Sequence, residues 1–294
     1  MKDEHKLKNK SIKMAFLLSG HFKNGKILEF LNSNTDIDVF VSCWDDFGFR
    51  NNNSLEKIEY SEIEKNIKKI KNLKSYEILN NKSFFDQNKN SSVNYYNYSS
   101  PEIFIKSQLY SINRSLKVFE KYKSLNNKNY DVIFKSRFDC NVIKFSIESE
   151  KIINDIEKNN IIFVTSNNCH YHPDFPNGCL ACNNMYRKGM LKPHIFDHTN
   201  IICDFFAYGN FESMKKYCSL YYEYDNLNKK FEQKNYNHIK NHNIPHIKKD
   251  NVTHLSHIDS LYYAYCSYPE RMLQYYLHDY MIVSSENVIT EYHP

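Results

Sequence analysis

Residues 12–44 read IKMAFLLSGHFKNGKILEFLNSNTDIDVFVSCW and contain two continuous apolar segments. These segments, 12–18 and 37–44, have the length and composition of strands that are buried on both faces of a parallel sheet. Residues 26–32, which lie between them, have the apolar spacing of a short amphipathic helix. A strand, a helix and a strand within about 30 residues are typical of a βαβ unit.

The rest of the chain continues this alternation. The clearest helix is expected at 101–124, where apolar residues recur every three or four positions after a serine cap and a proline. Alternating strands and helices predict an α/β sheet with helices on both faces. Further strands are expected at 76–79, 130–134, 161–165 and 281–283, and further helices at 54–71, 147–158, 211–224 and 269–279.

Length and composition favour one globular unit. The chain has 294 residues, of which 41% are hydrophobic, so it can bury a large core and is not globally disordered. Residues 1–10 are expected to form a flexible basic tail, and residues 11–294 a single domain. Loop insertions are expected near 80–100, 166–200 and 225–251, which are rich in Asn, Ser, His or Lys.

Charge and targeting signals restrict the location and the partners. The net charge of +5 comes from lysines scattered among acids, a pattern that does not indicate nucleic-acid binding. No apolar run reaches the roughly 18 residues of a membrane span, and residues 1–13 lack the apolar core of a secretory signal. We therefore expect an intracellular, cytoplasmic protein that is not secreted, whose eight cysteines are reduced.

In sheets of this kind, ligands bind beyond the carboxyl ends of the strands, which selects the loops 19–23, 45–46 and 137–139. In the first loop, Gly20 would let a ligand approach the backbone and Lys23 could meet a phosphate. An ordinary turn between strand and helix is the alternative. Neither a dinucleotide fingerprint nor a P-loop is present.

Acidic residues mark the other strand ends. Asp139 could hold Mg²⁺ or Mn²⁺, with Arg137 bracing it or a phosphate, or the two could form a structural ion pair. Asp45 could accept from ribose hydroxyls or cap the next segment. Asp204 lies in the apolar sequence CDFFAYG, where burial would raise its pKa and make it a usable base, although a structural role is the alternative.

A zinc site is a separate hypothesis. The spacing of Cys179 and Cys182 suits half of a structural zinc site that Cys169 or a histidine would complete. No second CxxC motif exists in the chain, so packing of an irregular loop is the favoured interpretation.

Several motifs occur in an order that resembles a known family. They are FLLSGHFK, DVFVSCWD, the helix SQLYSINRSLKVFEKY, YDVIFKSRFD, DFFAYGNFESMKKY and YPERMLQYYL. Together they resemble a group of nucleotide-sugar glycosyltransferases with a GT-A-like fold, found among viral and microbial sugar-processing proteins. The resemblance covers most of residues 12–284. It implies a mixed, mostly parallel sheet and transfer of a sugar from a nucleotide-diphosphate donor to a glycan or other hydroxyl acceptor.

The resemblance also implies roles for the strand ends. Ser19, Gly20 and Lys23 would line the nucleotide and phosphate pocket, and Asp45 would lie near the nucleoside. Lys23 stands where the group usually has arginine, which keeps the charge but loses the bidentate fork.

The acidic motif of the group corresponds here to Arg137, Phe138 and Asp139, and it contains one carboxylate. A divalent cation, Mn²⁺ or Mg²⁺, at Asp139 would then need phosphates, waters or a histidine to fill its shell. Asp204 would face the donor sugar or the acceptor and act as the acid or base, and Asp139 would share in catalysis through the metal.

Two functions outside catalysis stay open. The reduced motifs would also suit a non-catalytic α/β binding module with a degenerate nucleotide-sugar pocket. A zinc-stapled nucleic-acid-binding protein would use the Lys-rich segment 225–251 and the tyrosines of 94–98. The dispersal of basic residues among acids disfavours the second of these.

Overall fold

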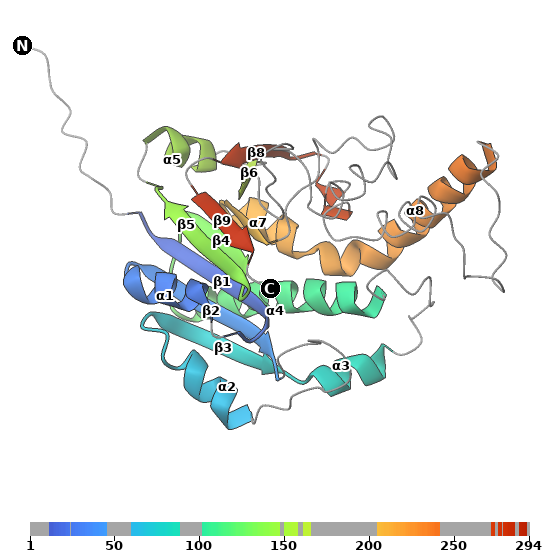
Figure 1. The fold of residues 1–294 in the computed structure, drawn as a ribbon. Helices are drawn as coiled ribbons and strands as arrows, with labels where there is room; N and C mark the ends of the chain where they lie inside the picture. The colour runs from blue at the N-terminus through green and yellow to red at the C-terminus, as the bar shows by residue number, and fades with distance from the viewer. Residues whose placement is uncertain are drawn as a thin grey trace, which may run out of the picture.

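The computed structural model describes most of the chain as an α/β fold (Figure 1). The described residues are 12–23, 25–45, 60–88, 102–147, 150–157, 161–165, 205–241, 272–273, 276–277, 279–285 and 288–292. The strands are β1 Met14–His21, β2 Ile37–Trp44, β3 Leu73–Leu79, β4 Val132–Arg137, β5 Cys140–Phe145, β6 Ile161–Thr165, β7 Phe206–Gly209, β8 Met281–Ser285 and β9 Val288–Tyr292. The helices are α1 Lys26–Ser33, α2 Tyr60–Ile67, α3 Asn81–Gln87, α4 Glu102–Leu125, α5 Glu150–Glu157, α7 Phe211–Cys218 and α8 Leu220–Asn241.

The main sheet is mixed and mostly parallel. Its strand order is β3-β2-β1-β4-β7-β6-β8, and β7 runs antiparallel to both of its neighbours. The expected α/β class and the βαβ unit at residues 12–44 are therefore confirmed. Because β1 pairs with β2 on one side and with β4 on the other, the order of strands reverses beside β1, which is the position where open α/β sheets bind ligands.

Helices cover both faces of this sheet. On one face, apolar residues of α1, α2 and α5 pack against the strands, and Ile27, Ile67 and Ile156 are all buried there. On the other face, α4, α7 and α8 form the second layer. No helix among the described residues is both long and apolar enough to cross a bilayer.

The first core layer is built around an aromatic side chain of β4. Phe134 is fully buried and contacts the rings of Phe16, Phe145, Phe206 and Tyr208, with centroids 5.3–6.1 Å apart. These five rings come from four strands of the two sheets. Packing around Phe134 therefore fixes the position of β4, whose last residue is Arg137.

The expected loop at 80–100 is wrong in its first part, because residues 81–87 form α3. Asn80 caps this helix by accepting a hydrogen bond from the backbone N–H of Ser83. Phe84 then packs against Trp44, with ring centroids 5.2 Å apart. Asn80, one of the asparagines that suggested a loop, is thus the cap of a helix. Phe84 attaches that helix to the end of β2.

The expected surface loop at 225–251 is also wrong as far as residue 241, because α8 continues to Asn241. Its first turns are attached to the core, since Tyr224 is fully buried and Leu227 packs on the same cluster. Asp225 forms an ion pair of 2.6 Å with the buried Lys106 of α4. These contacts hold the amino-terminal part of α8 against the core. The polar composition of residues 225–241 did not indicate this helix.

A second, two-stranded sheet was not expected from the sequence. It pairs β5 with β9 in antiparallel register, and Cys140 lies opposite Tyr292. β5 begins immediately after Asp139, so this small sheet anchors the chain on the downstream side of a candidate site residue. The basic tail at 1–10 and the expected insertion at 166–200 lie outside the described residues.

Candidate functional site

The loops that follow β1 and β4 pack on each other. Phe22 and Phe138 are buried and their ring centroids lie 5.3 Å apart. Gly25 brings the two backbones together, because a Cβ added there would lie 3.0 Å from the carbonyl oxygen of Phe138. The spacing between the two loops is therefore fixed by aromatic packing and by one close backbone contact.

This packing gathers three charged side chains, Lys23, Arg137 and Asp139, which we call the strand-end cluster. Arg137 donates from Nε to Oδ1 of Asp139 at 2.9 Å and from Nη2 to Oδ2 at 2.6 Å. The Nζ atom of Lys23 lies 3.7 Å from the same Oδ2 atom. Of the three strand ends selected from the sequence, the structure thus joins the first and the fourth through their side chains.

The two cations of the cluster are more exposed than its carboxylate. The side chain of Asp139 is 8% exposed, whereas those of Lys23 and Arg137 are each 22% exposed. Burial by itself raises the pKa of Asp139, but the charge and hydrogen bonds of Arg137, followed by the charge of Lys23, outweigh it and leave that pKa below its usual value of 3.8. Two cations and one carboxylate leave the cluster with one net positive charge.

The ionised form of Asp139 should stabilise the folded chain above acid pH. Because the folded-state pKa is lowered, this stabilisation is complete above the unfolded value near 3.8 and is lost as the pH falls through the lower folded value. We expect Asp139→Asn to flatten the fall in unfolding free energy below about pH 4, as followed by urea denaturation at a series of pH values. An unchanged slope in this variant would contradict the lowered pKa.

Phe205 extends the cluster to β7. Its ring lies under the guanidinium of Arg137, with the carbon Cζ 4.3 Å from the ring centroid. Arg137 is therefore held by Asp139 along one edge and by Phe205 across one face. Asp204, the candidate acid or base, immediately precedes Phe205 and lies outside the described residues.

At the end of β1, a ligand would meet the backbone of Gly20 rather than a side chain. Gly20 has a φ of +112°, a conformation that strongly favours glycine, and no described atom lies within 4 Å of a Cβ built there. A ligand could therefore approach this backbone closely. Ser19 is fully buried, and its hydroxyl donates to the carbonyl oxygen of Ser136 at 3.4 Å, which ties β1 to β4.

Asp45 makes a structural contact instead of joining the strand-end cluster. Its Oδ1 accepts from the backbone N–H of Asn81 at 2.9 Å, and its Oδ2 accepts from Nδ2 of Asn80 at 3.0 Å. Both partners belong to the start of α3. The capping alternative therefore has direct support, and a contact with the nucleoside stays a prediction.

Removing the Asp45 carboxylate should cost stability. We expect Asp45→Ala to lower the unfolding free energy by about 1 kcal/mol, since the first turn of α3 loses a charged acceptor. Urea denaturation measures this loss. Asp45→Asn keeps one acceptor oxygen and should lose less; equal losses in the two variants would contradict the capping role.

A divalent cation at Asp139 stays a prediction. The described residues contain no group of three or more His, Cys, Asp or Glu side chains arranged to hold a metal. Both oxygens of Asp139 already accept from Arg137, and a second cation lies beside them. The zinc candidates Cys169, Cys179 and Cys182 lie outside the described residues.

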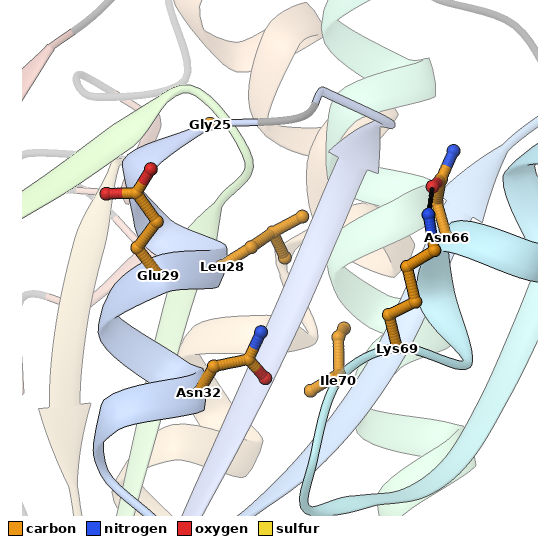
Figure 2. Close-up of a pocket in the computed structure, with 7 residues that line it drawn as sticks. All are labelled: Gly25, Leu28, Glu29, Asn32, Asn66, Lys69 and Ile70. Carbon is orange, nitrogen blue, oxygen red and sulfur yellow. Dashed lines mark hydrogen bonds between the residues drawn. The ribbon is translucent and has the colours of Figure 1, made fainter.

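A groove of about 260 Å³ lies elsewhere, between α1 and the turn that follows α2 (Figure 2). Leu28 and Ile70 form its apolar part, and the ammonium of Lys69 donates to the side-chain oxygen of Asn66 at 2.8 Å. Of its lining residues, Gly25 belongs to the segment between β1 and α1. The lining residues are Gly25, Leu28, Glu29, Asn32, Asn66, Lys69 and Ile70.

For four residues that shape the site, no role was predicted from the sequence. They are Phe22, Phe138, Phe205 and Gly25. The signal that could have found two of them is the repeated pattern of an aromatic residue directly before a charged one, in HFK and in RFD.

Comparison of the chain with protein-family models, with curated proteins and with solved structures gave no match. The functional argument therefore depends on the geometry of the strand-end cluster and on the order of the sequence motifs.

Proposed function

We propose that this protein is a glycosyltransferase that moves a sugar from a nucleotide-diphosphate donor to a hydroxyl acceptor. One observation carries the proposal: Lys23, in the loop after β1, and Arg137, the last residue of β4, place two positive charges together where the strand order reverses. Anionic ligands of α/β proteins bind at such positions. The mixed, mostly parallel sheet between two helical layers supports a GT-A-like fold, which is part of the proposal.

The cluster suits the departure of a diphosphate. When the bond between the sugar and the diphosphate breaks, negative charge grows on the leaving oxygen. Fixed cations near that oxygen lower the barrier, since they need no reorganisation during the reaction. Lys23 and Arg137 supply such cations, and the open backbone at Gly20 lets the phosphates approach.

The acceptor requires a group that removes its proton. As the acceptor oxygen bonds to the sugar carbon, its hydroxyl proton must pass to a base. Asp204 is our candidate, supported by its neighbour Phe205, which contacts Arg137 at the cluster. The donor then leaves as a nucleoside diphosphate, and the sugar is joined to the acceptor.

A non-catalytic binding module is the second candidate. The observation that favours it is the ion pair in which both oxygens of Asp139 accept from Arg137. A pair with a purely structural role would have the same geometry. Such a module would bind nucleotide sugars without releasing a nucleoside diphosphate, so the same experiment separates the two functions.

The test is a panel of UDP-, GDP- and CDP-sugars, with binding measured by calorimetry and turnover by release of nucleoside diphosphate. We expect one donor class to bind and turn over, and Lys23→Ala to weaken its binding at least tenfold. The matched control is Lys121→Ala, which removes an exposed lysine of α4. Binding without turnover for any acceptor would favour the binding module, and no binding by folded protein would refute both.

A further inference from the structure

We infer that the strand-end cluster binds a diphosphate group directly through Lys23 and Arg137, with no divalent cation held by Asp139. The inference rests on the proposed function and specifies how its donor would be bound. It also gives Asp139 a positioning role in place of the metal-ligand role that the sequence motif suggests.

The first argument is the access that a ligand has to the charges. The two cations are partly exposed, and the carboxylate is nearly buried. An approaching phosphate therefore has more access to the side chains of Lys23 and Arg137 than to that of Asp139. An approaching metal ion meets the same two positive charges, which repel it.

The second argument is that both oxygens of Asp139 are engaged by Arg137. They accept from Nε and Nη2 of Arg137, in the bidentate geometry that holds a guanidinium most firmly. Each oxygen keeps a second lone pair, but a metal ion bound there would share the carboxylate with Arg137 and lie next to its guanidinium. The repulsion between the dication and the guanidinium disfavours that arrangement.

The third argument is that Arg137 is already oriented. Asp139 binds one edge of the guanidinium, and the ring of Phe205 lies against one of its faces. Lys23 differs, because its Nζ lies 3.7 Å from the carboxylate, farther than a normal hydrogen bond. The guanidinium of Arg137 is therefore the more firmly positioned of the two cations.

The experiment uses inorganic pyrophosphate and Mn²⁺ as separate probes on the full chain. Calorimetry with pyrophosphate in EDTA should show saturable binding by the wild type, weakened at least tenfold by Lys23→Ala and restored by Lys23→Arg. Lys121→Ala is the control for loss of general positive charge. Titration with Mn²⁺ alone should give the same isotherm for the wild type and for Asp139→Asn.

In the binding experiments, the inference would be overturned by pyrophosphate that binds only when Mn²⁺ is present, or by a saturable Mn²⁺ site that Asp139→Asn removes. The wild-type titrations decide the question even if a variant does not fold. Failure of the proposed function would look different, because pyrophosphate would bind in EDTA while no nucleotide sugar turned over. Turnover that strictly requires Mn²⁺ would keep the proposed function and refute the direct diphosphate site.

Discussion

Arg137→Ala should lower kcat/KM for the nucleotide sugar by about a hundredfold or more, the usual cost of removing one preorganised group that stabilises developing charge. The variant removes a cation from the leaving diphosphate and leaves Asp139 nearly buried beside Lys23 alone. Steady-state release of nucleoside diphosphate, with the donor identified in the panel, measures the effect.

Two variants control this experiment. Arg137→Lys keeps the charge but cannot form the bidentate pair, so it should recover only part of the activity. Arg114→Ala removes an arginine with the same kind of pairing, since Arg114 donates to both oxygens of Glu77 at 3.0 and 2.6 Å. Glu77 lies three strands away from Arg137 at the same level of the sheet. Equal losses for Arg137→Ala and Arg114→Ala would show a general structural effect.

Phe134→Ala should produce the largest loss of stability, about 3–5 kcal/mol in the free energy of unfolding. The substitution empties the centre of a cluster of five aromatic rings and removes the contacts that fix β4. Equilibrium urea denaturation, followed by fluorescence and far-UV circular dichroism, gives the value.

Phe134→Leu should lose much less, because most of the volume stays filled. Tyr60→Ala, at a side chain that is 55% exposed, should leave the unfolding curve nearly unchanged. A loss below about 1 kcal/mol in Phe134→Ala would contradict a central position for this ring.

The sequence predicted the elements whose own residues carry a strong pattern. β1, α1 and β2 were found because two continuous apolar runs flank an amphipathic segment. α3 and part of α8 were missed because their polar composition resembles a loop, while contacts with residues distant in the chain hold each helix. The β5–β9 pair was missed because each strand is short and its partner lies far away in the chain.

The candidate site was partly predictable for the same reason. The rule that ligands bind at carboxyl strand ends led to Lys23, Arg137 and Asp139, and the structure places these three together. The rule could not separate them from Asp45, since a carboxylate after a strand can cap a helix as well as bind a ligand. The aromatic residues before Lys23 and Asp139 are visible in the chain, but nothing in the sequence shows that their rings contact each other.

The pairing of β5 with β9 has a consequence for biosynthesis. The residue after Asp139 finds its partner in Tyr292, so a ribosome translates most of the protein before that ladder can form. Until then, β5, which follows Asp139 in the chain, has no β9 to pair with. A nascent chain halted before residue 288 would contain the charged residues of the cluster but not β9, so the strand that pairs with β5 is added late in synthesis.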